Sequence, residues 1–235
     1  MSAARASLCP PSYVLALSLL ALGACRAADP ERTAATGVPA GSEPHTAGPR
    51  IVPASLPVEL QDPAARLAAA RMEGYFPNPV LISQGGERLR FYDDLVRGKR
   101  VVIQFLYSRC SGTCPVTSAN LMQVQAALGQ RLGRDFFIYS ITLDPEHDTP
   151  EVLAAHAERA GTPPGWLFLT GAPADIETLR RHLGVYDPDP LIDADLEQHS
   201  GMLVLGNEPL GRWCAVPGQL SAGALTRALE RVLEP

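Results

Sequence analysis

Clusters of basic residues, long apolar segments and internal repeats are all missing from this chain of 235 residues. Its 20 lysines and arginines are dispersed among 25 acidic residues, and the net charge is -5. A surface that binds nucleic acid needs clustered lysine and arginine, so no nucleic acid is expected as a partner. The composition is 46% hydrophobic, which is sufficient for one well-buried domain and some additional segments.

Cysteine is also scarce, with five residues in the whole chain. A small domain held together by disulfides would contain several dispersed cysteines, which this chain does not have. Cys9 and Cys25 lie near the N-terminus, and Cys214 is single. The remaining two, Cys110 and Cys114, are four positions apart and form the one closely spaced pair.

The first 24 residues have the pattern of an export signal, with an apolar core at 13–22. This core is shorter than the roughly 20 residues that a membrane-spanning helix needs. The sequence LGAC at 22–25 resembles the bacterial lipobox, in which the cysteine becomes the first mature residue and is lipidated. The alternative is an ordinary signal peptide that is cleaved near Ala24 or Ala28. We expect export to the periplasmic face of the membrane, with a lipid anchor on Cys25.

Residues 25–62 are rich in Ala, Pro, Gly and Thr and lack apolar periodicity, which is typical of a flexible tether. The folded domain is predicted at 63–235, beginning with a short helix at 63–71. Strands and helices then alternate, which predicts an α/β domain with a mixed central sheet flanked by helices. The predicted strands are 80–83 and 88–91, which form an N-terminal hairpin, 101–107, 136–143, 166–170, 202–206 and 210–215; the predicted helices are 115–132, 149–159, 174–183 and 222–233, the last of which follows a closing hairpin.

The cysteine pair lies in the sequence CSGTCP at 110–115, between the predicted strand 101–107 and the helix that follows it. Unpaired N–H groups and the dipole at the start of a helix favour thiolate, so we expect lowered thiol pKa values. Two thiols at this spacing can form a disulfide or bind a soft metal ion. A structural disulfide would gain little from closing so small a loop. Metal binding and redox chemistry therefore remain as the two main hypotheses.

Fold geometry predicts which residues lie near this pair. If strands 101–107 and 136–143 are parallel, their carboxyl ends share one edge of the sheet, where open α/β sheets place their sites. Residues 144–148 would then lie beside the cysteines. If strand 202–206 is antiparallel to them, its amino end lies at the same edge and brings His199 over the two sulfur atoms. His199 is therefore the candidate third ligand, and His147 is the rival candidate.

Three motifs, in order along the chain, resemble those of the Sco/SenC family. CSGTCP at 110–115 matches the CxxxCP motif of that family, and LDPEHDTP at 143–150 matches its DPxxDTP motif. HS at 199–200 matches the histidine–serine pair that precedes a strand. The resemblance extends over about residues 75–215, and it implies a thioredoxin-like fold.

The resemblance also implies a ligand set and a role. Cys110, Cys114 and His199 would bind copper, since two thiolates and an imidazole suit Cu(I) and also Cu(II). The implied partner is the copper-accepting subunit of cytochrome c oxidase, to which the protein would deliver copper during assembly. The sequence departs from the family pattern after His199, most clearly at the pair Trp213-Cys214.

The alternative is an enzyme, a thiol–disulfide oxidoreductase. In that case the Cys110 thiolate would attack a disulfide of the partner protein, and Cys114 would resolve the mixed disulfide. Asp144 and Asp148 are interpreted as structural residues of a turn and a helix cap. Cys214 is expected to be buried as a small apolar residue.

Overall fold

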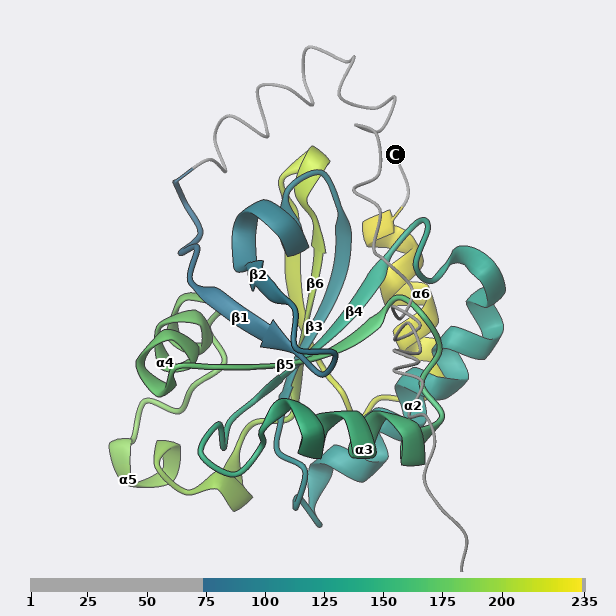
Figure 1. Cartoon of the computed structure of the whole chain (residues 1–235). Helices are drawn as coiled ribbons and strands as arrows, with labels where there is room; N and C mark the ends of the chain where they lie inside the picture. Colours follow the sequence, from purple (N-terminus) through teal and green to yellow (C-terminus); the bar gives the residue numbers. More distant parts are fainter. Residues whose placement is uncertain (1–73, 234–235) are drawn as a thin grey trace, which may run out of the picture. The chain divides into compact units, whose positions relative to one another are not determined.

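The computed structural model describes residues 74–233. The predicted export signal at 1–24, Cys25, the tether at 25–62 and the helix expected at 63–71 lie outside these residues. The described part of the chain contains a seven-stranded mixed sheet in the order β2-β1-β5-β4-β3-β6-β7 (Figure 1). Within residues 74–233, no helix has both the length and the apolar character that crossing a bilayer requires.

The observed elements follow the predicted ones closely. The strands are β1 (Val80–Ser83), β2 (Arg88–Arg90), β3 (Arg100–Leu106), β4 (Phe137–Thr142), β5 (Trp166–Gly171), β6 (Met202–Asn207) and β7 (Arg212–Pro217). The helices are α2 (Thr113–Leu128), α3 (Pro150–Ala160), α4 (Pro173–His182), α5 (Pro190–Asp193) and α6 (Ala222–Leu233), and Phe91–Val96 forms a π-helical turn. The short helix α5 was not predicted from the sequence.

Strand directions confirm the arrangement on which the predicted site depends. β3, β4 and β5 are parallel neighbours, and β6 pairs with β3 in the antiparallel direction. The carboxyl ends of β3 and β4 and the amino end of β6 therefore share one edge of the sheet. β1 and β2 form the predicted N-terminal hairpin, and β6 and β7 form the closing one.

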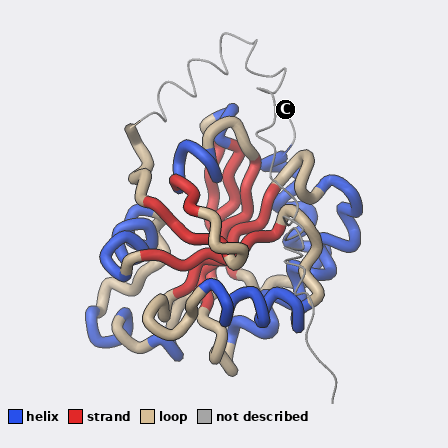
Figure 2. The backbone as a smooth tube through the Cα atoms, in the orientation of Figure 1, coloured by secondary structure: helices blue, strands red, loops and turns tan. Residues whose placement is uncertain are grey.

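Two hydrophobic clusters cover the two faces of the sheet, because successive residues of a strand point to opposite faces. Val102 of β3 belongs to one cluster, which includes residues of α2, α3 and α6. Its neighbour Ile103 belongs to the other, which includes residues of α4 and the turn Phe91–Val96. Helices consequently flank both sides of the strands (Figure 2).

The helix α2 presents a regular apolar stripe to the sheet. Leu121, Val124 and Leu128 are buried at the three- and four-residue spacing that the sequence predicted. α2 also packs beside α6 (Figure 1). This packing fixes the helix, and with it Cys114 in its first turn, relative to the sheet.

The last strand corrects one expectation from the sequence. Cys214 is exposed, and it does not lie in the core. The reason is its position on β7, which is an edge strand that pairs only with β6. Four of the six residues of β7, Cys214 among them, are exposed, and only Trp213 and Val216 are half-buried.

Candidate metal centre

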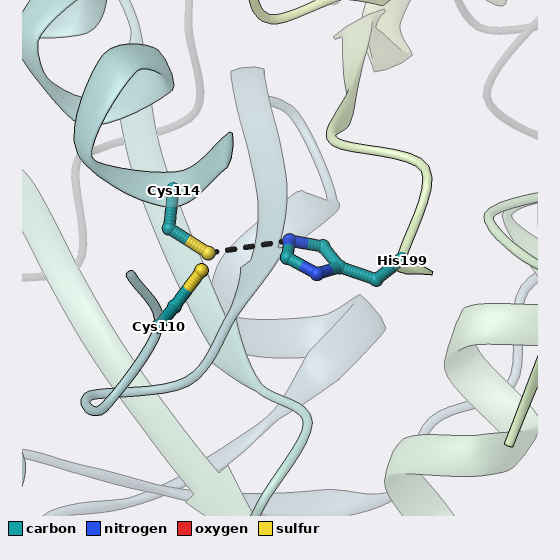
Figure 3. Close-up of side chains that lie close together, drawn as sticks. All are labelled: Cys110, Cys114 and His199. Atoms are coloured by element: carbon teal, nitrogen blue, oxygen red, sulfur yellow. Dashed lines mark hydrogen bonds between the residues drawn. The ribbon is translucent and has the colours of Figure 1, made fainter. Parts of the chain in front are cut away.

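The structure brings together the three residues that the sequence predicted as ligands. One sulfur from Cys110, one from Cys114 and one ring nitrogen of His199 all lie within 4.8 Å of one another (Figure 3). Within residues 74–233 this is the one cluster of three or more His, Cys, Asp or Glu residues with that geometry. His147, the rival ligand, is exposed and is not part of the cluster.

The two cysteines come from the connection between β3 and α2. Cys110 lies in the turn after β3, where its N–H donates to the Tyr107 carbonyl oxygen at 3.1 Å. Cys114 is the second residue of α2 and is buried, whereas Cys110 is half-buried. Both are free thiols in this structure. Cys110 is thus the more exposed residue of the pair.

The expected lowering of the thiol pKa is wrong for Cys114. Burial raises the pKa of the Cys114 thiol well above its ordinary value, and the adjacent Cys110 raises it further. Backbone hydrogen bonds from Tyr107 and from Cys114 itself oppose this shift, but desolvation outweighs them. Cys114 is therefore protonated without a metal ion, and binding of a metal ion at its sulfur must release a proton.

His199 precedes β6, and its ring orientation is fixed from both sides. Its Nδ1 lies 2.7 Å from the carbonyl oxygen of Leu196, which can only accept, so Nδ1 carries the proton. Nε2 then has a free lone pair and faces the Cys114 sulfur at 3.2 Å. The hydroxyl of Thr113 lies 3.2 Å from the same Nε2. Histidines that bind metals are commonly oriented in this way by a carbonyl on the other ring nitrogen.

Tyr107 is a further residue of the site that sequence reasoning missed. Its ring packs edge-on against the His199 ring, with 5.8 Å between the centroids. Burial, followed by the Cys110 thiol, raises the pKa of Tyr107 to about 12, so its hydroxyl stays neutral. The available signal was its position as the last residue of the predicted strand, three residues before Cys110.

Asp148 links the cysteine loop to the neighbouring strand. Its buried carboxylate accepts hydrogen bonds from the Ser108 N–H at 3.0 Å and from the Thr142 hydroxyl at 2.6 Å, and the Ser108 hydroxyl also donates to it. Asp144 instead forms an ion pair at 2.6 Å with the exposed side chain of Arg109. The carboxylate of Asp148 does not itself cap the helix, because Thr149 is the N-cap of α3; Asp148 instead fixes the turn that precedes Cys110.

The segment from Pro190 to His199 is attached to α4 by ion pairs. Asp193 forms ion pairs with Arg180 and with Arg181, and the side chains of Asp193 and Arg180 are only 6% and 12% exposed. A cavity of about 380 Å³ borders His199 on this side and is lined by residues of α4 and of the segment. The Asp193 pairs therefore hold a segment that is not packed tightly along its whole length.

We expect Asp193→Asn to lower the free energy of unfolding by about 2 kcal/mol near neutral pH, as for other hydrogen bonds between charged groups. Arg180 holds the pKa of Asp193 well below its ordinary range. An unfolded aspartate titrates at about pH 3.9, so the unfolded chain binds the proton first as the pH falls. The stabilisation is thus complete above that pH and is lost progressively below it.

Urea unfolding of both proteins at about pH 7 and about pH 3 measures this effect. The difference in the free energy of unfolding between wild type and Asp193→Asn should be smaller at the lower pH. Glu177→Gln is the matched control, because Glu177 also contacts Arg180 but is 43% exposed; its effect should stay below about 1 kcal/mol. The prediction would be contradicted if Asp193→Asn lowered the free energy of unfolding, relative to the wild type, by the same amount at both pH values.

The chemistry of the three donors indicates which ions fit. Thiolates are soft ligands that select ions such as Cu(I) and Zn²⁺, and imidazole binds both copper and zinc. No carboxylate belongs to the cluster within residues 74–233, which disfavours hard ions such as Mg²⁺ and Ca²⁺. The residues present therefore fit a soft or borderline ion with two sulfur ligands and one nitrogen ligand.

Comparisons with known proteins agree with the fold and the site. A Stutzerimonas stutzeri protein, named as a candidate copper-binding protein, is 26% identical over 165 residues, 68% of this chain and 76% of its own length. The copper-bound structure of ScoI from Bradyrhizobium japonicum matches with a TM-score of 0.52 and 24% identity, over 65% of this chain and 96% of ScoI.

BsSco, described as a member of the Sco family of cytochrome c oxidase assembly proteins with a disulfide switch, matches with a TM-score of 0.52 and 22% identity. That match covers 66% of this chain and 91% of BsSco. The structural matches confirm the predicted thioredoxin-like fold. The model of the SCO1/SenC family matches residues 69–234, which includes all of the described residues and the three candidate ligands. This chain therefore belongs to the SCO1/SenC family.

Proposed function

We propose that this protein binds copper through Cys110, Cys114 and His199 and delivers it to the copper-accepting subunit of cytochrome c oxidase during assembly. The convergence of two sulfur atoms and one imidazole nitrogen within 4.8 Å is the observation that carries the proposal. The donor set suits Cu(I) and also Cu(II). Membership of the SCO1/SenC family, the copper-bound ScoI structure and the oxidase-assembly role given for BsSco support it.

The N-terminal sequence extends the proposal to the location of the protein. An export signal at 1–24 and a lipid on Cys25 would place the protein at the periplasmic face of the membrane. The tether at 25–62 would then connect the lipid to the copper-binding domain. This arrangement would keep the domain close to a membrane-bound acceptor while leaving it free to change its orientation.

The positions of the ligands suit transfer of copper as cargo. Cys110 is half-buried, so its sulfur can be reached by the thiol of an acceptor, whereas Cys114 is buried. Among the His, Cys, Asp and Glu side chains of residues 74–233, three meet at the site, which would leave room for an incoming ligand before an existing one departs. Protonation of Cys114, whose thiol pKa is raised by burial, would favour release of the ion.

The second candidate function is reduction of disulfides in a partner protein. It is favoured by the two free thiols on one short loop and by the disulfide switch described for BsSco. In this reaction the Cys110 thiolate attacks the partner's disulfide, and Cys114 then attacks the mixed disulfide and releases the reduced partner. His199 is not required for these steps, so its removal separates the two functions.

Copper content after anaerobic loading with Cu(I) and removal of weakly bound ion tests the proposal. We expect about one copper per chain in the wild type. Cys110→Ser, Cys114→Ser and His199→Ala should each lower the affinity, the cysteine variants most strongly. His147→Ala is the matched control, because it removes an exposed histidine from the loop beside the site and should leave copper binding unchanged.

Two results would contradict copper transfer. One is a wild type that retains no copper while its cysteines cycle readily between dithiol and disulfide, which would favour the reductase. The other is a copper content in Cys110→Ser, Cys114→Ser and His199→Ala that equals the copper content of the wild type. If His199→Ala loses copper and still reduces a disulfide substrate, both functions belong to the same pair of thiols.

A further inference from the structure

Two glycines at the open end of the closing hairpin lie against the start of α2. Met202 and Pro217 form the last register pair between β6 and β7, and Gly201 and Gly218 come just beyond it. The Gly218 N–H donates to the Gly201 carbonyl oxygen at 2.9 Å, which extends the ladder by one bond. Both glycines are buried. The hairpin thus reaches the helix through two glycines, which have no side chains to separate the two elements.

On the helix side, residues at a spacing of four and three form a seam along this contact. Thr113 lies against Gly201, and Thr117, one turn later, lies against Gly218. The side-chain amide of Asn120 donates to the carbonyl oxygens of Gly218 at 3.1 Å and Leu220 at 2.8 Å. The helix α2, which carries Cys114, is therefore in direct contact along this seam with the hairpin of β6 and β7, and His199 lies just before this hairpin.

Gly218 has no space for a side chain. A Cβ atom there would lie 2.5 Å from the Thr117 methyl carbon, and 2.8 Å from both the Thr117 hydroxyl and the Gly201 carbonyl oxygen. These distances are shorter than van der Waals contact, and one of them involves backbone. Its φ lies outside the left-handed region, so the close approach alone requires glycine at this position.

We propose that Gly218 is a positioning residue for His199: its missing side chain lets the hairpin approach α2 closely enough for His199 Nε2 to face the Cys114 sulfur. Gly218 bonds to Gly201, and Gly201 is two residues after His199. This inference rests on the proposed copper site. A second observation agrees with it, because Thr113 in the same seam also contacts His199 Nε2 at 3.2 Å.

The proposal makes a specific prediction about which ligand is affected. Both cysteines belong to α2 or the loop before it, so they keep their mutual arrangement when the hairpin moves away. His199 belongs to the hairpin side and would move with Gly201. A methyl group at position 218 should therefore reduce the contribution of His199 to the Cu(I) affinity. Binding of Cu(I) by the two sulfur atoms should remain.

The experiment compares Cu(I) affinity of Gly218→Ala and wild type by competition with a chelator, both with His199 and in the His199→Ala background. We expect Gly218→Ala to lower the affinity at least about 10-fold when His199 is present and less than about 2-fold when it is absent. Gly223→Ala is the matched control, because a Cβ there meets only Arg227 at an ordinary 3.6 Å, and its affinity should equal that of the wild type.

Asn120→Ala provides a second test that introduces no steric clash. It removes the two hydrogen bonds to the 218–220 loop and should lower the affinity a few-fold, again only when His199 is present. Urea unfolding of each variant confirms that the folded protein is being measured.

Equal losses of affinity with and without His199 would overturn the positioning role, as would a Gly218→Ala protein that binds copper like the wild type. A wild type that binds no Cu(I) would instead overturn the proposed function, and the copper-site inference with it.

Discussion

Asp148→Asn is expected to lower the free energy of unfolding by about 3 kcal/mol and to weaken copper binding at the same time. Asp148 is fully buried, and its carboxylate accepts hydrogen bonds from the Ser108 N–H and hydroxyl and from the Thr142 hydroxyl. An asparagine replaces one acceptor oxygen by a donor, which leaves buried donors facing each other. Such losses cost about 1–3 kcal/mol, and more where the acceptor is charged.

The copper effect follows from the position of Ser108, two residues before Cys110. Residues that orient metal ligands typically change affinity by about 10- to 100-fold when they are replaced. Urea unfolding and Cu(I) competition measure the two effects. Asp144→Asn is the matched control, since Asp144 lies in the same motif but pairs with the exposed Arg109; its cost should stay below about 1 kcal/mol. If Asp148→Asn lowered the free energy of unfolding by less than about 1 kcal/mol, Asp148 would not anchor the cysteine loop to β4.

Oxidation of Cys110 and Cys114 to a disulfide is expected to lower the Cu(I) affinity by about 1000-fold or more, which corresponds to about 4 kcal/mol. The thiolate is the form that binds metal, and a disulfide leaves neither sulfur in that form. Of the three donors only the His199 nitrogen would remain. Copper binding and disulfide formation therefore exclude each other at this site, which makes the redox state of the pair a condition for carrying copper.

The measurement is Cu(I) competition on protein treated with a mild oxidant, with free thiols counted in parallel. Reduction of the disulfide should restore the affinity of the untreated protein. The Cys214→Ser variant is the control, because Cys214 is an exposed cysteine outside the cluster, and the variant should respond to oxidation as the wild type does. Copper binding that persists after both site thiols are lost would mean that the ligands lie elsewhere.

The sequence was sufficient to predict the meeting of residues that are far apart in the chain. His199 is 85 residues after Cys114, and nothing local connects them. The prediction succeeded because the directions assumed for β3, β4 and β6 hold in the structure, and those directions place three loops at one edge of the sheet. The family motifs pointed to the same residues, and the structure confirms their convergence.

Properties that depend on the burial of a side chain could not be predicted from the sequence. The position of Cys114 at the start of a helix suggested a lowered thiol pKa, but desolvation by the surrounding fold raises it. Cys214 has an apolar neighbourhood in the sequence, and only the sheet order shows that its strand is an edge. The hydrogen bond from His199 to the Leu196 carbonyl depends on a short turn whose geometry the residue pattern does not specify.

The sheet order has a consequence for when the three candidate ligands can first come together. β6 lies next to β3 although it is formed by a much later part of the chain, and His199 immediately precedes it. During synthesis, the cysteine loop therefore emerges long before its histidine. An incomplete chain would offer two thiols without the third donor. Full-affinity binding of copper would thus require a chain that extends past His199, whereas a shorter chain would bind Cu(I) through its two cysteines alone.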